Sequence, residues 1–285
     1  MAKIIKNMKN KKENFAYETY KSVESSTNFS SAKELQEYRS LLMDRVYKKE
    51  IPFIKKKFPK GLGSTLEVGS GNSRILYALE KENLITKAIG LEISPSRSTF
   101  AKEWKKDLKS KIVENICGDI FSMDIKEKFD TVLCLTSIFP FFDMLEKDGL
   151  NKFIKKANQL LKPNGIIILE SVTFKQEIEC ALSYEGKVNL WAEFKKTDPF
   201  QFNLVEYVWN EKKRELVATT YNTMRHKLFI DGPTTKKWHM EESKTIEKKL
   251  SKNSFQIQSV YGGYNGNTYK SNSLEYIFIA KKIKK

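Results

Sequence analysis

An acidic residue precedes a glycine-rich turn in the first third of the chain. Glu67 is followed by Gly69 and Gly71 in the segment Leu-Glu-Val-Gly-Ser-Gly. Glycines here let the backbone approach a ligand closely, because they carry no side chain. A dinucleotide-binding turn would need another glycine where Arg74 stands, and a phosphate loop would need a Gly-Lys-Ser/Thr sequence, which the segment lacks. The carboxylate of Glu67 instead suits a ligand with an amino group and a sulfonium and without a pyrophosphate.

Two further acids follow apolar segments. Glu92 lies in Gly-Leu-Glu-Ile, and its carboxylate can accept hydrogen bonds from both hydroxyls of a ribose. Asp119 lies in Gly-Asp-Ile and can accept a hydrogen bond from the amino group of an adenine. Acids at such positions also commonly cap the next helix, so neither is specific alone. Their order and spacing after the glycine turn strengthen the assignment.

Alternating strands and helices position these residues. The apolar periodicity predicts strands over 64–68, 88–93, 113–117, 131–135 and 166–170, with helices over 74–83, 95–109 and 151–161. Short apolar strands that alternate with helices predict a parallel sheet covered on both faces, and right-handed crossovers make it a doubly wound α/β sheet. Ligands bind such sheets at the carboxyl ends of the strands, where the three acids lie.

The pattern changes after residue 171 to longer segments that alternate apolar and polar residues. We expect strands over 203–209, 216–230, 234–240, 255–262 and 275–281, a helix over 241–251, and a partly helical stretch over 184–196. The chain therefore divides into a flexible N-terminus (1–13), an N-terminal helical cover (14–60), a core (61–173), an inserted antiparallel flap (174–252) and a closing hairpin (253–285). We expect one domain with an insert rather than two independent domains.

The segments named above resemble the motifs of class I S-adenosylmethionine-dependent methyltransferases. The resemblance covers residues 62–172: the glycine turn, the segments around Glu92 and Asp119, Phe129–Cys134, and the turn Leu-Lys-Pro-Asn-Gly that ends at Gly165. It implies a Rossmann-like, doubly wound sheet of seven strands with an N-terminal helical cover and an antiparallel flap. It also implies S-adenosylmethionine as the cofactor, with S-adenosylhomocysteine as the product.

The resemblance implies roles for the matched residues. Glu67 and Gly69 would hold the amino-acid end of the cofactor, Glu92 the ribose, and Asp119 with Ile120 the adenine. The full set of expected cofactor-binding residues is Glu67, Gly69, Ser70, Gly71, Glu92, Ile93, Asp119, Ile120 and Leu135. Ser73 stands where the family has its third glycine, which leaves the start of the following helix less certain.

The flap and the N-terminal cover are similar to the parts that roof the acceptor in methyltransferases of small molecules. The expected substrate-binding residues are Tyr17, Tyr20, Phe139, Phe142 and Glu170. Each also has a plain alternative: the aromatic residues could be packing residues, and Glu170 could only cap its strand. The expected reaction is in-line methyl transfer to a hydroxyl or amine of a small polar metabolite, sugar-like or of another kind.

A hydroxyl acceptor would call for a general base. The chain has two histidines, His226 and His239, and His226 is the candidate catalytic base. The alternative is that both are ordinary residues on the surface of a strand.

Composition bears on the rival functions. The formal charge is +16, yet only six of the 51 basic residues are arginines, and lysines occur along nearly every segment. A lysine surface is therefore favoured over a nucleic-acid footprint, which clusters on one face. A nucleic-acid methyltransferase and a non-catalytic cofactor-binding module remain the alternatives. No apolar run is long enough to cross a membrane, no metal site is expected, and the three cysteines indicate a cytoplasmic protein, while the oligomeric state cannot be read.

Overall fold

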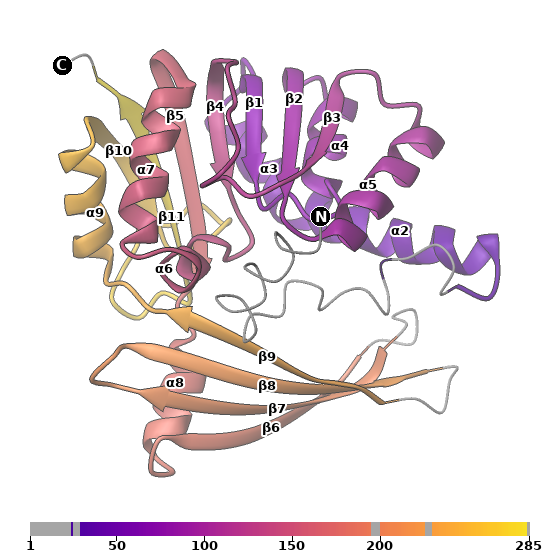
Figure 1. Cartoon of the computed structure of the whole chain (residues 1–285), viewed down its shortest axis with the longest axis vertical. Coiled ribbons are helices and arrows are strands. Elements are labelled where there is room, and N and C mark those ends of the chain that lie inside the picture. The colour runs from indigo at the N-terminus through magenta and orange to yellow at the C-terminus, as the bar shows by residue number, and fades with distance from the viewer. Residues whose placement is uncertain (1–23, 25–28, 195–199, 226–229, 284–285) are drawn as a thin grey trace, which may run out of the picture.

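The structure of the chain, a computed structural model, describes residues 24, 29–194, 200–225 and 230–283 (Figure 1). It contains two sheets. The larger has seven strands in the order β10-β11-β5-β4-β1-β2-β3, and the smaller has four in the order β6-β7-β8-β9. This architecture confirms the predicted fold, a doubly wound seven-stranded sheet with an added antiparallel sheet.

The elements of the larger sheet are β1 (Gly63–Val68), β2 (Ile85–Glu92), β3 (Val113–Cys117), β4 (Phe129–Cys134), β5 (Leu161–Val172), β10 (Phe255–Tyr261) and β11 (Glu275–Lys282). Those of the smaller sheet are β6 (Lys187–Glu193), β7 (Phe200–Asn210), β8 (Glu215–Met224) and β9 (Ile230–His239). The α-helices are α2 (Ala32–Lys48), α3 (Glu50–Lys57), α4 (Arg74–Lys81), α5 (Pro95–Leu108), α6 (Phe142–Leu145), α7 (Gly149–Leu160), α8 (Lys175–Leu182) and α9 (Ser243–Lys252), and the 3-10 helix η2 spans Phe139–Phe141.

Strands β1 to β5 run parallel to one another, and β11 joins antiparallel to β5, followed by β10. Because parallel strands end at the same edge, their carboxyl ends lie together, and Figure 1 shows this edge facing the four-stranded sheet. The strand order changes direction between β1 and β4, which is where open α/β sheets form a ligand-binding crevice.

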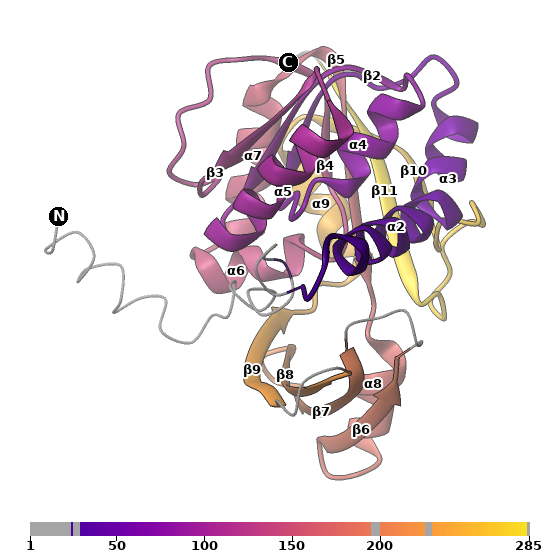
Figure 2. The ribbon, with the colours of Figure 1, turned by 90° about the vertical axis from the view of Figure 1, so that its right-hand side faces the viewer.

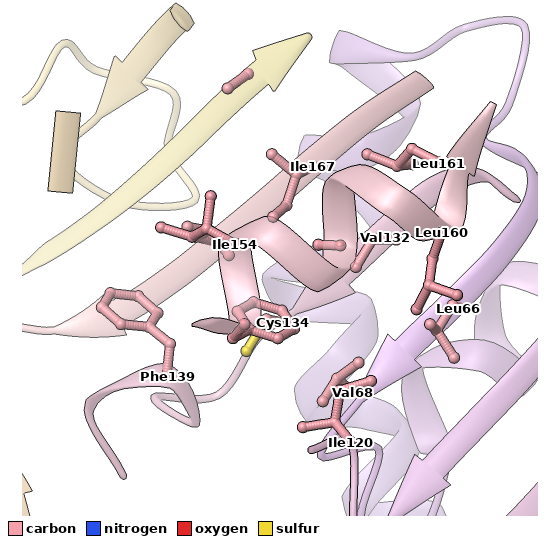
Figure 3. Packing of buried hydrophobic residues seen from close by; sticks show 14 of the residues in the cluster. Leu66, Val68, Ile120, Val132, Cys134, Phe139, Ile154, Leu160, Leu161 and Ile167 are labelled. Atoms are coloured by element: carbon pink, nitrogen blue, oxygen red, sulfur yellow. The ribbon is translucent and has the colours of Figure 1, made fainter. Parts of the chain in front are cut away.

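Helices cover both faces of the larger sheet, as Figure 2 shows from the side. On one face, buried residues of α2 to α5 pack with the sheet, among them Leu76, Phe100 and Trp104. On the other, α7 and α9 pack with the sheet through residues such as Ile154 and Leu250 (Figure 3). No helix among the described residues is long and apolar enough to cross a membrane.

The start of α4 explains how Ser73 replaces a glycine. Ser73 precedes the helix with a φ of 59°, in the left-handed region that glycine adopts most easily. Its hydroxyl donates a hydrogen bond to Oδ1 of Asn115 at 2.6 Å, so a buried partner holds the side chain in place. The helix begins at Arg74, as predicted, despite the missing glycine.

The smaller sheet packs one face against the larger part of the molecule. Its buried residues include Leu216, Ala218 and Trp238, and Phe141 and Phe174 from the neighbouring segments pack against them. Helix α8 covers the same face, through Ile178. The flap is therefore attached to the core by an aromatic contact and not only by the chain connections at its two ends.

Several predicted boundaries are wrong. The stretch 184–196, expected to be partly helical, contains β6, because its alternating side chains pair along β7. The long strand expected over 216–230 is two strands, since β8 ends at Met224 and Ile230 begins β9. Helix α9, which falls within 174–252, packs with the larger sheet rather than with the flap. The predicted helical cover over 14–60 is represented by α2 and α3, and its residues before position 29 lie outside the described part, apart from Glu24.

Candidate active site

A cavity of about 290 Å³ lies between the carboxyl ends of the parallel strands and the smaller sheet. Segments that follow β1, β2, β3 and β4 form its floor, α2 forms one side, and β9 contributes Lys236 and Trp238 from the flap. A cavity of this kind, with apolar walls and a few convergent polar groups, is the usual form of a small-molecule site.

The glycine turn presses its backbone against neighbouring side chains. Gly69 lines the cavity with a φ of +73°, and a Cβ built on it would lie 2.7 Å from Ile138. Gly71 has a φ of +57°, and a Cβ there would lie 2.3 Å from a guanidinium nitrogen of Arg97. Neither position has room for a side chain. The turn therefore brings main-chain atoms to the cavity wall at Gly69.

Glu92 lies at the end of β2, buried and lining the cavity. Its Oε2 accepts a hydrogen bond from the amide of Gly71 at 2.7 Å, and its Oε1 accepts one from the amide of Ser94 at 2.8 Å. Each carboxylate oxygen has a second lone pair, so the group can still accept hydrogen bonds from a diol. The two amides fix the carboxylate at the junction of the glycine turn and α5.

Asp119 and Ile120 lie after β3 and line the cavity together with Gly118. The Oδ1 of Asp119 accepts a hydrogen bond from the amide of Phe121 at 3.0 Å, which orients the carboxylate at the start of this turn. Ile120 is 4% exposed and packs in the cluster of Val68 and Leu91 (Figure 3). This combination offers an acidic group beside an apolar surface, which suits a flat heterocycle with an amino group.

Glu67 lies at the end of β1, one strand away from Glu92. Its side chain is buried and does not line the cavity, and its Oε2 has no hydrogen-bond partner among the described residues. Burial raises the pKa of Glu67 to about 8, opposed by the positive charge of Arg74, which does line the cavity. A cation brought close to such a carboxyl group would stabilise its ionised form.

Glu170, at the end of β5, supports the loop after β4. It accepts hydrogen bonds from the amides of Thr136 and Ser137, and both of these residues line the cavity. Each has a φ of +58°, an unfavourable conformation for residues other than glycine. The carboxylate therefore stabilises a strained loop at the cavity wall. Burial raises the pKa of Glu170 to about 8, despite these two hydrogen bonds.

The N-terminal cover contributes a buried acid that the sequence did not suggest. Glu24 is 1% exposed and lines the cavity, where its Oε2 accepts a hydrogen bond from Nε of Arg97 at 2.8 Å. Its Oε1 accepts one from the side-chain amide of Asn72 at 2.8 Å. Tyr38, Leu42 and Arg45 of α2 line the same side of the cavity. The cover is thus tied to the glycine turn and to the first turn of α5.

The flap side of the cavity is aromatic. The ring of Trp238 lies 4.7 Å from that of Phe174 and 5.4 Å from that of Phe141, measured between centroids, and all three residues line the cavity. The Nε1 of Trp238 is buried and has no hydrogen-bond partner among the described residues. Lys236, two residues earlier on the same strand, places a positive charge at this wall.

The structure brings together part of the predicted set. The residues predicted from the sequence that line the cavity are Gly69, Glu92, Ile93, Asp119, Ile120 and Phe142. Those that lie behind its wall are Glu67, Ser70, Gly71, Leu135, Phe139 and Glu170. Phe139 in particular is 1% exposed and packs with Cys134 and Ile154 on the far face of the sheet (Figure 3), so its expected place in the acceptor site is wrong. Tyr17, Tyr20 and His226 lie outside the described residues.

The cavity also contains residues that sequence reasoning missed. They are Glu24, Tyr38, Leu42, Arg45, Val68, Arg74, Leu91, Arg97, Ser137, Ile138, Leu145, Phe174, Lys236 and Trp238. The sequence could have indicated Arg97, because it lies in the first turn of the helix that follows Glu92. No such signal existed for Trp238, because the register of its strand decides whether it faces inward.

Comparisons with known proteins agree with this geometry. The sequence matches the methyltransferase domain family over residues 60–252, and no curated protein matches it. A solved S-adenosylmethionine-dependent methyltransferase from Clostridium acetobutylicum has a similar fold, with a TM-score of 0.69, 15% identity, and coverage of 94% of this chain and 97% of that chain.

Two further structures with a similar fold have descriptions that name their acceptors. CalS10, an amino pentose methyltransferase from Micromonospora echinaspora, has a TM-score of 0.55 at 15% identity and covers 86% of this chain and 89% of its own. KedS8, a sugar N-methyltransferase from Streptoalloteichus, has a TM-score of 0.55 at 13% identity and covers 93% of this chain and 91% of its own. At these identities the likeness is one of fold.

Proposed function

The chain belongs to the methyltransferase domain family, and from that premise we propose that it transfers the methyl group of S-adenosylmethionine to an amine or hydroxyl of a small, polar, sugar-like metabolite. One observation carries this proposal. A single cavity joins the acids at the ends of β2 and β3 to the aromatic wall of the flap, so a cofactor and a small acceptor would lie side by side in it.

The residues present fit the cofactor. Glu92 supplies a carboxylate with free lone pairs for the ribose hydroxyls, and Asp119 with Ile120 supplies an acid and an apolar surface for the adenine. Gly69 allows the backbone to approach the amino-acid end, and Oε2 of Glu67, which has no partner among the described residues, offers a hydrogen-bonding group behind that point. When bound, S-adenosylmethionine supplies a methyl group on a sulfonium, which a lone pair of the acceptor attacks in line.

The protein's own contribution is position and exclusion of water. The loop of Thr136 and Ser137, held by Glu170, lies between the glycine turn and the flap and would set the distance between the two reactants. Phe141, Phe174 and Trp238 shield this space. The size of the cavity and the aromatic wall that the flap adds to it favour a small acceptor over a macromolecule.

A sugar-like acceptor is supported by the polar groups on the flap side. Nε1 of Trp238 is a donor with no partner in the described part of the chain, and Lys236 adds a second donor to the same wall. The descriptions of CalS10 and KedS8 name an amino pentose and a sugar nitrogen as methyl acceptors, which is consistent with such a wall. His226 stays the candidate base for a hydroxyl acceptor, and His226→Ala should lower turnover at saturating cofactor if it has that role.

Calorimetry with S-adenosylhomocysteine tests the cofactor half of the proposal. We expect binding, and no binding of NAD or ATP at the same concentration, because the glycine turn lacks the phosphate-binding residues. A radiolabelled methyl group, offered together with amino sugars, neutral sugars and a short RNA, tests the other half. Label in the RNA but in no sugar would contradict the proposal.

A further inference from the structure

The smaller sheet has two edges that differ in their protection. β6 and β9 are its outer strands, and Figures 1 and 2 show β6 on the side away from the larger sheet. β9 contains Pro233 and Lys236 and lies against the core through η2 and α6. Proline and lysine are common devices that keep an edge strand from pairing with another chain. β6 has no proline, its one lysine is Lys187 at its first position, and only one of its seven residues is buried.

Apolar side chains are exposed beside the unprotected edge. Trp191 is 71% exposed, and Leu190 next to it is 39% exposed. Trp191 pairs with Leu204 of β7, and Leu204 pairs with Tyr221 of β8, so these three side chains form a row across one face of the sheet. Leu204 and Tyr221 are 53% and 42% exposed. Such a row on an edge marks a surface for another protein.

The hydrogen bonds to β7 leave alternate residues of β6 directed outward. Gly186 and Phe194 each share a backbone hydrogen bond with the neighbouring strand, to Trp209 and Gln201. In an antiparallel ladder the hydrogen-bonded residues alternate, so the even-numbered residues of β6 bond to β7. The main-chain groups of Asn189 and Trp191 therefore point away from the sheet, and no strand among the described residues pairs with them.

The sequence of β6 complements itself when it is reversed. In an antiparallel pair centred on Leu190, Lys187 lies opposite the partner's Glu193, Val188 opposite the partner's Ala192, and Asn189 opposite the partner's Trp191. Opposite charges and apolar pairs across strands are stabilising. Several registers place the outward-facing backbone groups of one β6 opposite those of the other. Among them, only this register pairs all seven residues and places Lys187 opposite Glu193.

The same register covers the exposed tryptophan. Asn189 and Trp191 lie on one face, so the two copies of Trp191 are diagonal neighbours across the two-fold axis, at a distance that aromatic side chains bridge. The two copies of Leu190 meet on the other face. Hydrogen bonding, charge and apolar contact therefore agree on one arrangement.

We infer that β6 is the contact strand of a homodimer, in which two copies of this chain pair β6 with β6 about a two-fold axis and the two flaps form one continuous eight-stranded sheet. In this dimer the free edge of each flap pairs with the same edge of the other copy. This is the closed, isologous type of contact that most homodimers use. The flap strand that lines the cavity is β9, at the opposite edge of the sheet from β6, so pairing through β6 does not cover Lys236 or Trp238.

Charge exchange between Lys187 and Glu193 tests this inference in the full chain by sedimentation velocity over a concentration series. The wild type should form dimers. Lys187→Glu and Glu193→Lys should each weaken dimerisation by about tenfold or more, because two attractive contacts become repulsive in each symmetric pair. An equimolar mixture of the two variants should form heterodimers. The double variant Lys187→Glu, Glu193→Lys should dimerise more tightly than either single variant, although it lacks the ion pair of Lys187 with Glu206 of the same chain. The control Lys33→Glu reverses a charge that is 85% exposed on α2 and should have no effect.

A proline provides a second, independent test. Asn189→Pro removes an outward amide without removing a hydrogen bond to β7, so the fold should persist while the dimer is lost. Circular dichroism and binding of S-adenosylhomocysteine establish that each variant is folded. A wild type that stays monomeric at every concentration, or single charge variants that dimerise as well as the wild type, would overturn the inference. A double variant that dimerises no more tightly than the single variants would also overturn the proposed register.

Discussion

The carboxylate of Glu24 is bonded to the guanidinium of Arg97 at 2.8 Å, although 73 positions separate the two residues in the sequence. Glu24 belongs to the N-terminal cover, and Arg97 lies in the first turn of α5 with its guanidinium against Gly71. The side chains are 1% and 15% exposed, so the pair is largely shielded from water. This contact fastens the cover to the cofactor side of the cavity.

Replacement of Glu24 should loosen that fastening. Glu24→Ala leaves the guanidinium of Arg97 and the amide of Asn72 without their shared acceptor, so we expect the free energy of unfolding to fall by about 1–3 kcal/mol. Urea denaturation followed by circular dichroism measures the change. Glu37→Ala is the matched control, because Glu37 is 60% exposed on α2, and it should stay within about 0.5 kcal/mol of the wild type. Equal losses in the two variants would contradict a special role for Glu24.

Glu92 should matter for the cofactor in addition to holding the amides of Gly71 and Ser94. Glu92→Ala removes the acceptor proposed for the ribose hydroxyls, and charge-assisted hydrogen bonds of this kind contribute about 1.5–3 kcal/mol, or ~10–150-fold in Kd. Calorimetry with S-adenosylhomocysteine measures the loss. The variant Asp124→Ala removes an acid that is 73% exposed in the loop after β3 and should bind normally. If the Glu92 variant bound with wild-type affinity, the ribose assignment would be wrong.

The strand-end acids could be predicted from the sequence because their positions follow from local patterns. A short apolar strand ending at Glu92 or Asp119 fixes where the side chain lies in a parallel sheet, whatever the rest of the chain does. The contribution of Glu24 depends on how the N-terminal cover folds back, and no local pattern records that. The strand β6 was mistaken for a partly helical stretch, because a short exposed strand with Trp191 and Leu190 lacks a clear period.

Phe139 shows the opposite error. The aromatic run after β4 suggested a pocket wall, yet the 3-10 turn directs Phe139 into the core and leaves Phe141 and Phe142 at the cavity. Neighbouring residues in a tight helical turn point in different directions, so the sequence could place the run near the site without assigning its faces. Side-chain direction came only from the tertiary packing.

Two substitutions of Trp238 should separate its packing from its polar atom. Trp238→Ala removes a ring that packs on Phe141 and Phe174, and we expect a loss of about 3 kcal/mol in the free energy of unfolding. Trp238→Phe keeps one aromatic ring but removes Nε1 together with the second ring of the indole, so we expect a smaller loss of about 1–2 kcal/mol. Denaturant unfolding measures both. Tyr184→Ala, at a site 67% exposed, is the control for loss of an aromatic residue in the flap.

The same phenylalanine variant tests the acceptor site. If Nε1 of Trp238 donates to the acceptor, Trp238→Phe should raise the KM for the acceptor by about tenfold, in line with one lost hydrogen bond, and leave the affinity for S-adenosylhomocysteine unchanged. An unchanged KM would remove Trp238 from the proposed recognition of the acceptor. It would leave the proposed cofactor site untouched, because Glu92 and Asp119 lie at the other side of the cavity.

The last prediction concerns pH. Burial raises the pKa of Glu67 and of Glu170 from 4.5 to about 8. At a pH between these two values, the folded protein therefore holds two protons that the unfolded chain has released. Stability falls with rising pH wherever the folded state binds more protons. This contribution is therefore fully present below pH 4.5, decreases as the pH rises toward 8, and is lost above it. We expect a slope on the order of 1 kcal/mol per pH unit for each group within this window.

Neutral replacements should remove that slope. Glu67→Gln and Glu170→Gln keep the shape of the side chain but cannot titrate, so each variant should lose less stability than the wild type between pH 5.5 and pH 8, a window set by the two pKa values. Urea unfolding at several pH values measures the difference, and subtracting the wild-type curve cancels the titration of all other groups. Glu37→Gln should reproduce the wild-type curve, since Glu37 is largely exposed. A parallel curve for Glu67→Gln would mean that Glu67 is ionised in the folded protein at neutral pH. Its charge would then be balanced by Arg74 before any cofactor arrives, because the positive charge of Arg74 opposes the effect of burial on Glu67 more than any other group does.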